Sequence, residues 1–386
     1  MTDVEPVPDF GLTLGIEEEY LIVDRDTRDL VREPDPGFME ACSARVGNQV
    51  TNEYLQCQVE IGTPPVADIA GARESLIGLR RAVADAAAEF GYAPIAASTH
   101  PFARWRDQTH TRKDRYDALR SDLGQTIRRM MICGMHVHLG IENPDLRVDV
   151  MNQVTYFLPH LLALSCSSPF WEGEDTSLAS YRLAVFGSLP RSGLPDLLTS
   201  WAEYQRLVDQ LVGAGCLEDA SKIWWDIRPS SKFPTLEQRI TDVCSRLDDA
   251  LCVAATYQSL VSFLFVLRAN NQRWRQYPTT LIEENRWRGQ RYGVRGQMVD
   301  HGKAILVPFG DLAEELIGLL GPSARALNCE NELLHIRTII NGGTSADRQR
   351  EAARKARENG ATGEEAMRTV VDHLIGEFLE GAEPGA

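Results

Sequence analysis

The chain has 386 residues, of which 43% are hydrophobic and 25% are charged, so it can bury a large core as a globular protein. Its formal net charge of −15 argues against a nucleic-acid surface, because contact with phosphate backbones needs a basic face. Residues 1–10 are acidic and lack the basic start and apolar core of a signal peptide. The eight cysteines form no Cys-x-x-Cys pair, which is typical of reduced thiols and favours a cytoplasmic protein.

Four segments alternate between apolar and polar residues, and this period of two predicts β-strands over 12–23, 54–61, 134–141 and 235–241. Apolar residues at helical spacing predict helices over 68–90, 148–165, 196–213 and 244–268, and two more helices within 345–380. The strands are half-buried and lie between long helices. This pattern favours an α+β fold with a largely antiparallel sheet, one face packed on helices and the other facing something polar.

The most apolar long stretch, residues 251–267, still contains Thr256, Gln258 and Ser262. It therefore predicts a buried core helix rather than a membrane span. No low-complexity linker divides the chain. We expect a single catalytic domain over residues 1–386, with residues 345–386 as a C-terminal helical extension of it.

The first predicted strand carries three consecutive glutamates. Successive side chains of a strand point to opposite faces, so Glu17 and Glu19 share one face while Glu18 lies on the other, with Ile16 and Tyr20. Two adjacent carboxylates repel each other unless a cation neutralises them. A solvated acidic edge strand has the same pattern, so this run alone leaves a metal site and a plain surface equally open. Because Glu18 turns away, we expect it to tolerate replacement by Gln far better than its neighbours do.

The second and third strands add further polar side chains of the same kind. Glu60 lies on the polar face of the second strand, whereas Glu53 belongs to the approach to that strand. His136 and His138 share one face of the third strand, and a His-x-His strand is a typical metal-binding pattern, although a single histidine is more often a core residue. These two strands favour a metal site without proving one.

The fourth strand places Glu237 and Arg239 on one face, which a surface ion pair would also explain. The repetition over four strands is the stronger signal, because a sheet face rarely needs so many carboxylates unless divalent cations bind there. Oxygen-rich ligand sets suit Mg²⁺ or Mn²⁺ better than zinc. The residues that this face would supply are Glu17, Glu19, Glu60, His136 and Glu237.

Basic residues that could meet an anionic substrate come from the middle of the chain. Arg182 precedes a proline-bounded loop, and Lys222 and Arg228 flank two tryptophans. Arginine forks bind carboxylate or phosphate at two points. Neither a Gly-x-x-x-x-Gly-Lys-Ser/Thr loop nor a Gly-x-Gly-x-x-Gly fingerprint occurs, so the sequence does not support a P-loop or a Rossmann fold.

Six motifs then occur in order along the chain: Gly15–Asp24, Ser98–Trp105, Cys133–His138, Trp225–Pro229, Thr235–Asp242 and Asn341–Arg348. Together they closely resemble the glutamate–cysteine ligase type 2 family, also called the YbdK-type carboxylate–amine ligases. The resemblance spans roughly residues 10 to 355. It implies a fold related to glutamine synthetase and glutamate–cysteine ligase, in which a curved, mainly antiparallel sheet forms an active-site funnel with helices packed outside.

The resemblance also implies roles for individual residues. Metal positions map onto Glu17, Glu19, Glu53, Glu60, His136 and Glu237, with His138 and Asp242 as further candidates. Arg239 and Glu60 would be catalytic, Arg239 by stabilising the transferred phosphoryl group. Arg182, Lys222 and Arg228 would bind the substrate or ATP.

The implied chemistry is ATP-dependent amide formation. ATP converts the carboxylate to an acyl phosphate, Mg²⁺ (or Mn²⁺) holds the phosphates, and the amine attacks. The expected reaction is γ-glutamyl transfer to cysteine or another amine. Ligation of a different acid–amine pair, a metal-dependent hydrolase and a non-catalytic nucleotide-binding regulator are the alternatives. The expected partners are small molecules, namely an amino acid, an amine and ATP, with no nucleic acid and no membrane; a homodimer stays open.

Overall fold

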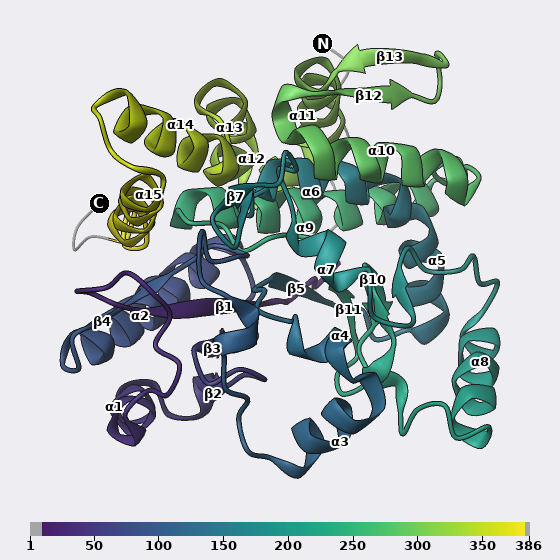
Figure 1. Ribbon diagram of the computed structural model, residues 1–386. Helices are drawn as coiled ribbons and strands as arrows, with labels where there is room; N and C mark the ends of the chain where they lie inside the picture. The colour runs from purple at the N-terminus through teal and green to yellow at the C-terminus, as the bar shows by residue number, and fades with distance from the viewer. Residues whose placement is uncertain (1–9, 383–386) are drawn as a thin grey trace.

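The computed structural model describes residues 10–382 and is built around one seven-stranded sheet (Figure 1). The strand order is β10-β11-β5-β1-β3-β2, and β4 pairs with the second half of β1. Every pairing in this sheet is antiparallel, as the sequence predicts. Its strands are β1 (Leu14–Asp24), β2 (Val50–Asn52), β3 (Gln58–Gly62), β4 (Tyr92–Ile95), β5 (Met135–Gly140), β10 (Ile227–Pro229) and β11 (Thr235–Gln238).

Three short two-stranded pairs lie outside the main sheet: β6 (Phe170–Trp171) with β7 (Glu174–Asp175), β8 (Ser192–Gly193) with β9 (Trp224–Trp225), and β12 (Gln297–Asp300) with β13 (Ile305–Pro308). The helices of the first half are α1 (Pro36–Val46), α2 (Ile69–Ala88), α3 (Asp114–Leu123), α4 (Gln125–Arg128), α5 (Pro144–Val154), α6 (Leu158–Ser165), α7 (Arg182–Phe186) and α8 (Trp201–Gly213). Those of the second half are α9 (Leu247–Ala269), α10 (Thr279–Tyr292), α11 (Phe309–Ala326), α12 (Glu330–Leu334), α13 (Ile336–Gly342), α14 (Ser345–Glu358) and α15 (Gly363–Glu377).

Helices cover one face of the sheet. Helices α2, α5 and α9 pack against its strands, and α9 lies at the centre of the core. Helix α9 is long and apolar enough to cross a membrane by length and composition, but 83% of its most apolar window is buried inside the protein. The expectation of a buried core helix is therefore confirmed. The opposite face of the sheet is left to polar side chains, with α3 and α4 beside it (Figure 1).

The predicted elements are confirmed in type, but some boundaries differ. Strand β3 begins at Gln58 rather than at residue 54, because the backbone N–H of Gln58 donates to the carbonyl of Leu55 in a turn. The predicted helix over 148–165 starts earlier, at Pro144, where the Asn143 side chain caps it. It is then broken into α5 and α6 near Pro159, which has no N–H to continue the helical hydrogen bonding.

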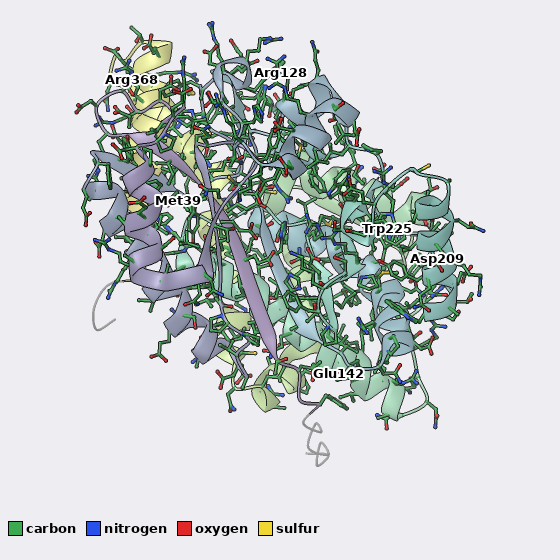
Figure 2. The ribbon with its side chains drawn as sticks, turned by 90° about the horizontal axis from the view of Figure 1, so that it is seen from below. Met39, Arg128, Glu142, Asp209, Trp225 and Arg368 are labelled. Carbon is green, nitrogen blue, oxygen red and sulfur yellow. The ribbon has the colours of Figure 1, made fainter. Side chains whose placement is uncertain are left out.

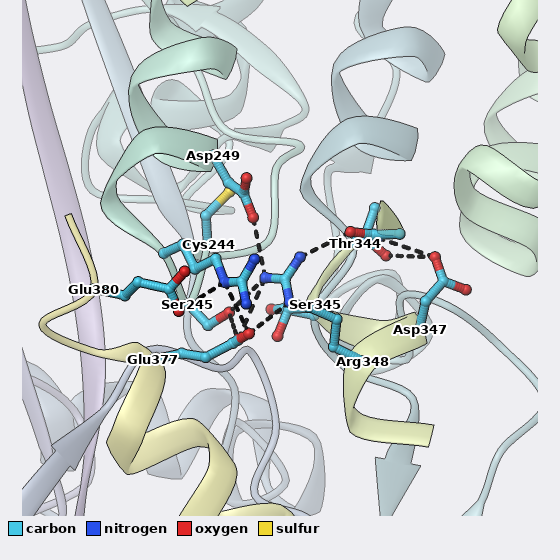
Figure 3. A network of polar contacts seen from close by, with 12 residues as sticks. Cys244, Ser245, Asp249, Thr344, Ser345, Asp347, Arg348, Glu377 and Glu380 are labelled. Carbon is cyan, nitrogen blue, oxygen red and sulfur yellow. Dashed lines mark hydrogen bonds and ion pairs between the residues drawn. The ribbon is translucent and has the colours of Figure 1, made fainter. Parts of the chain in front are cut away.

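Polar contacts join the two C-terminal helices to the core (Figure 3). Arg348 of α14 donates to Glu377 of α15 at 2.6 Å and to Asp249 of α9 at 3.0 Å. The same guanidinium donates to the carbonyl of Gly343 and to the hydroxyl of Ser245. Helices α14 and α15 therefore share a buried charge network with the start of α9.

A buried ion pair lies behind the first strand. Glu18 and Arg80 are both 0% exposed, and the Arg80 Nη2 and Nε atoms lie 2.6 and 2.9 Å from the two carboxylate oxygens. The Tyr20 hydroxyl donates to the same carboxylate. Arg80 also donates to the carbonyls of Cys244, Ser245 and Phe378, so it joins β1 to the segment before α9 and to the end of α15.

This arrangement corrects one expectation. Strand alternation does turn Glu18 away from Glu17 and Glu19, but Glu18 is not dispensable. Its negative charge is the counter-charge of Arg80 in a dry environment, and removing one partner of such a pair leaves the other buried and uncompensated.

We therefore expect Glu18→Gln to lower the free energy of unfolding by about 3–5 kcal/mol, which is the usual cost of breaking a buried ion pair from one side. Urea denaturation followed by circular dichroism measures the change. The matched control is Glu364→Gln, whose partner Arg368 is also exposed. That control should change stability by no more than about 0.5 kcal/mol. A Glu18→Gln protein as stable as the control would show that the pair is not needed for folding.

Candidate active site

The strand registers place the predicted side chains on the uncovered face of the sheet. Directly paired residues of antiparallel strands point to the same face. Glu17 pairs with His136 across β1 and β5, and Glu19 pairs with Glu60 across β1 and β3. One strand further, Glu237 of β11 pairs with His138 of β5. The sheet order β11-β5-β1-β3 therefore arranges these residues in a continuous row.

The middle of this row is a cluster of donor atoms. His136 Nδ1 lies 3.2 Å from Glu17 Oε2, and His138 Nε2 lies 3.4 Å from Glu17 Oε1. One donor atom each of Glu17, His138 and Glu237 lies within 4.8 Å of the other two. The ring of His138 is oriented by the Thr235 hydroxyl, 2.9 Å from its Nδ1. This is the spacing expected of groups that could close on one divalent cation.

The two histidines are also poised to act as ligands. The Nε2 atom of His136 is buried and forms no hydrogen bond with any described residue, whereas the buried Nε2 of His138 faces only the Glu17 carboxylate, at 3.4 Å. Burial and the nearby positive charge of Arg239 lower the pKa of His136 to about 4, so its imidazole is neutral at physiological pH. A buried nitrogen without a partner is costly, and a metal ion would satisfy it. The cluster of three candidate ligands includes His138, which the family resemblance gives only as a further candidate, after His136.

A second acidic group lies beside the first. Glu53, in the loop between β2 and β3, approaches Glu19 and Glu60. Burial, together with the charge of Glu53, raises the pKa of Glu19 to about 7. Burial and the charges of Glu53, Glu17 and Glu19 raise the pKa of Glu60 well above its usual range. Crowded carboxylates of this kind suit a hard cation with oxygen ligands, such as Mg²⁺ or Mn²⁺.

At the Glu237 end of the row, arginines balance the negative charge. Burial would raise the pKa of Glu237, but the charges of Arg239 and Arg228 hold it far below its usual range. Arg239 Nη1 donates to Glu237, while its buried Nε forms no hydrogen bond with a described residue. The guanidinium of Arg239 thus keeps a free N–H beside the carboxylates.

A hydrogen bond to Asp226 fixes the backbone of Arg239. Its N–H donates to the carbonyl of Asp226 at 2.8 Å. Asp226 is fully buried, and its carboxylate pairs with Arg286 of α10 at 2.6 and 3.2 Å. A charged contact from an outer helix therefore fixes the segment that carries Arg239.

Arg228 differs from its predicted role. Its Nε and Nη2 contact the Glu237 carboxylate at 3.0 and 3.3 Å, and its Nη1 donates to the carbonyls of Ser221 and Ile223. Each of its guanidinium nitrogens already has a partner. Arg228 therefore orients Glu237 and the loop before β9, which uses four of its five guanidinium N–H groups.

Arg182 lies close to Glu19, and the chain makes room for it with a glycine. A Cβ atom on Gly134 would come within 2.4 Å of Arg182 Nη2. The backbone N–H of Gly134 donates to Glu19 at 2.7 Å, and the Arg182 guanidinium donates to the carbonyls of Arg239 and Ile240. Gly134 thus donates a hydrogen bond to Glu19 and, because it lacks a side chain, leaves room for Arg182.

The hydrogen bonds of the Asp242 carboxylate argue against a role for it as a metal ligand. Its carboxylate accepts hydrogen bonds from the Ser167 backbone and from the hydroxyls of Ser168 and Ser180, at 2.7 to 2.9 Å. The Ser168 hydroxyl in turn accepts the backbone N–H of Arg182. Asp242 therefore positions Arg182 through Ser168, in contrast to the metal role that the sequence suggested for it.

One hollow adjoins the row of residues, and a second one meets the first at Lys222. The inner cavity has a volume of about 170 Å³, with Glu19, Glu53, His136, Arg182, Lys222 and Arg239 on its polar side. Apolar and aromatic side chains from α3, α4 and the residues around them form its other wall, including Tyr116, Leu119 and Ile127. The sequence did not indicate these wall residues, because nothing in their local pattern differs from that of an ordinary helix.

The outer cleft is wider, about 730 Å³, and is lined by α8 and by residues 218–222 and 230–234. Lys222 lines both hollows. Inside the outer cleft, the Tyr204 hydroxyl and the Arg147 Nε are buried without a hydrogen-bond partner among the described residues, and Arg147 lies over the ring of Trp201. Figure 2 places Asp209 of α8 and Trp225 at one end of the molecule, with Met39 and Arg368 at the other.

Comparisons with known proteins agree with this architecture. The model of the glutamate–cysteine ligase family 2 matches residues 13–373. A relative from Rhodospirillum rubrum, which carries the provisional name glutamate–cysteine ligase 2, is 56% identical over 97% of this chain and 98% of its own. A relative from Roseiflexus castenholzii with the same provisional name is 39% identical over 99% of this chain and 98% of its own.

Two solved structures share the fold at low sequence identity. The glutamate–cysteine ligase of Francisella tularensis, solved in complex with AMP, is 15% identical with a TM-score of 0.68 and covers 97% of this chain and 90% of its own. A bifunctional glutathione synthetase from Pasteurella multocida is 14% identical with a TM-score of 0.70, and this chain covers 53% of its length. The expected fold, a mainly antiparallel sheet with helices packed outside, is confirmed. The chain belongs to the glutamate–cysteine ligase family 2 and is a carboxylate–amine ligase.

Proposed function

We propose that the protein uses ATP to join the γ-carboxylate of glutamate to cysteine or to another amine. The observation that carries the proposal is the row of carboxylates and neutral histidines, flanked by a free arginine N–H, beside the inner cavity. A carboxylate does not condense with an amine in water, and a site rich in cation ligands and arginine is suited to phosphoryl transfer. The relatives' names and the AMP complex of the similar structure support the same reaction.

We assign the two hollows to different substrates. The outer cleft lies within the range of volumes, about 300–1,000 Å³, that hold small-molecule ligands, and its aromatic and basic lining suits a nucleotide. The inner cavity is smaller and suits the acid. Lys222, which lines both, would lie beside the phosphates that pass between them.

The residues present fit divalent cations at two places. Glu17, His138 and Glu237, with His136 beside them, would hold one ion, and Glu19, Glu53 and Glu60 a second. Bound Mg²⁺ or Mn²⁺ would neutralise the phosphate charge and keep the reacting groups in line.

The reaction then needs two displacements. A carboxylate oxygen of the acid bonds to the γ-phosphorus as the bond to ADP breaks, which gives an acyl phosphate. The amine nitrogen next bonds to the acyl carbon, the bond to phosphate breaks, and the nitrogen loses a proton. The free N–H of Arg239 would stabilise charge on the transferred phosphoryl group, and Arg182 would orient the acid in the inner cavity. No side chain has to act as a nucleophile, so catalysis consists mainly of positioning and charge stabilisation.

The direct test measures ADP release with Mg²⁺ and ATP, using glutamate and cysteine as the first pair and other acids and amines afterwards. We expect release only when acid and amine are both present. Hydrolysis of a substrate without nucleotide would instead support a metal-dependent hydrolase. ATP binding without amide formation for any pair would support a regulator.

The cation assignment is tested by Glu17→Gln and Glu60→Gln, which remove charge from the two proposed positions. We expect each to lower the ligation rate at least ~100-fold, as is usual for loss of one group that stabilises transition-state charge. Independently of activity, titration of the protein with Mn²⁺ by electron paramagnetic resonance should show weaker binding. Glu174→Gln, on the exposed strand β7, is the matched control and should change neither. Unchanged Mn²⁺ affinity in both variants would contradict the assignment.

Arg239→Lys keeps the positive charge but loses the planar fork. We expect kcat to fall by ~100-fold or more while the KM for ATP changes by less than ~5-fold, because the missing N–H matters most in the transition state. Steady-state kinetics checks the split. An equal rise in KM without a change in kcat would show that Arg239 serves ground-state binding instead.

A further inference from the structure

Glu53 differs from the other candidate cation ligands on carboxylates because it lies outside the sheet. Strand β2 ends at Asn52 and β3 begins at Gln58, so no strand of the described sheet pairs with Glu53. Its carboxylate accepts the N–H of the next residue, Tyr54, at 2.8 Å, which orients the side chain only relative to its own backbone. A metal ligand keeps its place when its surroundings hold it. The loop that carries Glu53 therefore needs support from outside the sheet.

Residues 109–111 run antiparallel beside this loop. The N–H of Gln56 donates to the carbonyl of Thr109 at 2.9 Å, and the N–H of Thr111 donates to the carbonyl of Tyr54 at 2.8 Å. These two bonds form a short antiparallel ladder outside the main sheet. The loop after β2 is thus fixed by a segment that lies more than fifty residues further along the chain.

Thr111 adds a contact that reaches Glu53 itself. Its hydroxyl donates to the carbonyl of Glu53 at 2.6 Å, and no other described residue donates a hydrogen bond to that carbonyl. On the other side of Glu53, the carbonyl of Asn52 accepts the hydroxyl of Tyr116 at 3.2 Å. The peptide groups before and after Glu53 are therefore both held by α3 and the residues that precede it.

The segment that holds Glu53 also forms part of the wall of the inner cavity. Tyr116 and Leu119 of α3 line this cavity, and the ring of Tyr116 packs edge-on against that of Tyr54, with 5.6 Å between the ring centroids. The residues before α3 are joined to the helix by His110, whose Nε2 lies 3.0 Å from the carboxylate of Asp117. The position of Glu53 thus depends on the cavity wall rather than on strand pairing.

We propose that Thr111 is a positioning residue, whose hydroxyl holds Glu53 where its carboxylate can share a divalent cation with Glu19 and Glu60. This inference rests on the proposed function, which places a second cation at these three carboxylates. The hydroxyl acts through the backbone of Glu53 and leaves the ligand itself unchanged. Its removal should therefore weaken cation binding by about the contribution of one hydrogen bond, without abolishing it.

The first test is Thr111→Val, which keeps the branched side chain and the backbone ladder but removes the hydroxyl. Titration of the full chain with Mn²⁺, followed by electron paramagnetic resonance, should show affinity at the second cation position lowered ~3- to 10-fold. Thr111→Ser, which retains a hydroxyl, should restore the affinity to within ~2-fold. With saturating Mg²⁺, kcat should stay within ~2-fold while the KM for Mg²⁺ rises, because the ligands themselves are all present.

Thr109→Val is the matched control. Thr109 belongs to the same segment, but its hydroxyl contacts Glu33, at 3.4 Å, and its bond to the loop uses the backbone carbonyl that valine also has. This variant should leave Mn²⁺ affinity unchanged. Circular dichroism confirms that each variant is folded.

A double variant shows whether Thr111 acts through Glu53. In a Glu53→Gln protein, Thr111→Val should lower Mn²⁺ affinity by less than ~2-fold further, because the carboxylate that the hydroxyl positions is already lost.

Three results would overturn the inference alone: unchanged Mn²⁺ affinity in Thr111→Val although Glu60→Gln weakens binding, an equal loss in Thr109→Val, or a full further loss when Thr111→Val is added to Glu53→Gln. Mn²⁺ affinity that neither Glu53→Gln nor Glu60→Gln changes would overturn the second cation position itself, and the inference with it.

Discussion

The arrangement of this site depends on how one strand separates its charges. Strand β1 carries three consecutive glutamates, and the pleat sends Glu17 and Glu19 to one face and Glu18 to the other. On the covered face, Arg80 neutralises Glu18 completely and joins the strand to the segment before α9 and to the end of α15. On the open face, no described arginine or lysine forms an ion pair with Glu17. One strand therefore combines a charge that is satisfied for stability with charges that are left for a ligand.

Along the open face, the charge around each carboxylate differs from one end of the row to the other. Glu19 and Glu60 have raised pKa values because they are buried near Glu53, whereas Glu237, beside two arginines, has a lowered one. The row thus passes from a part that lacks positive charge to a part that contains it. Cations would complete the first part, and at Glu237 a cation would share the carboxylate with the two arginines. The proposed phosphoryl transfer would use both parts, since phosphate oxygens are bound by metal ions and by guanidinium groups.

Much of this could be predicted from the sequence, because alternation in a strand is a local property. The separation of Glu18 from its neighbours, the shared face of His136 and His138, and the antiparallel sheet all follow from residue spacing. The partners of each side chain do not. Residue spacing does not reveal that Arg228 contacts Glu237, Ser221 and Ile223, nor that Arg80 lies behind Glu18. The outer cleft was missed because its buried polar groups, on Arg147 and Tyr204, come from different helices with no motif between them.

The ion pair between Asp226 and Arg286 has a further consequence. Arg286 belongs to α10, and the carbonyl of Asp226 holds the backbone of Arg239. Helix α10 and Arg239 are therefore linked by one short chain of contacts. Thermodynamic linkage is reciprocal, so any influence that contact at α10 has on substrate affinity must appear, by the same factor, as an influence of substrate on that contact.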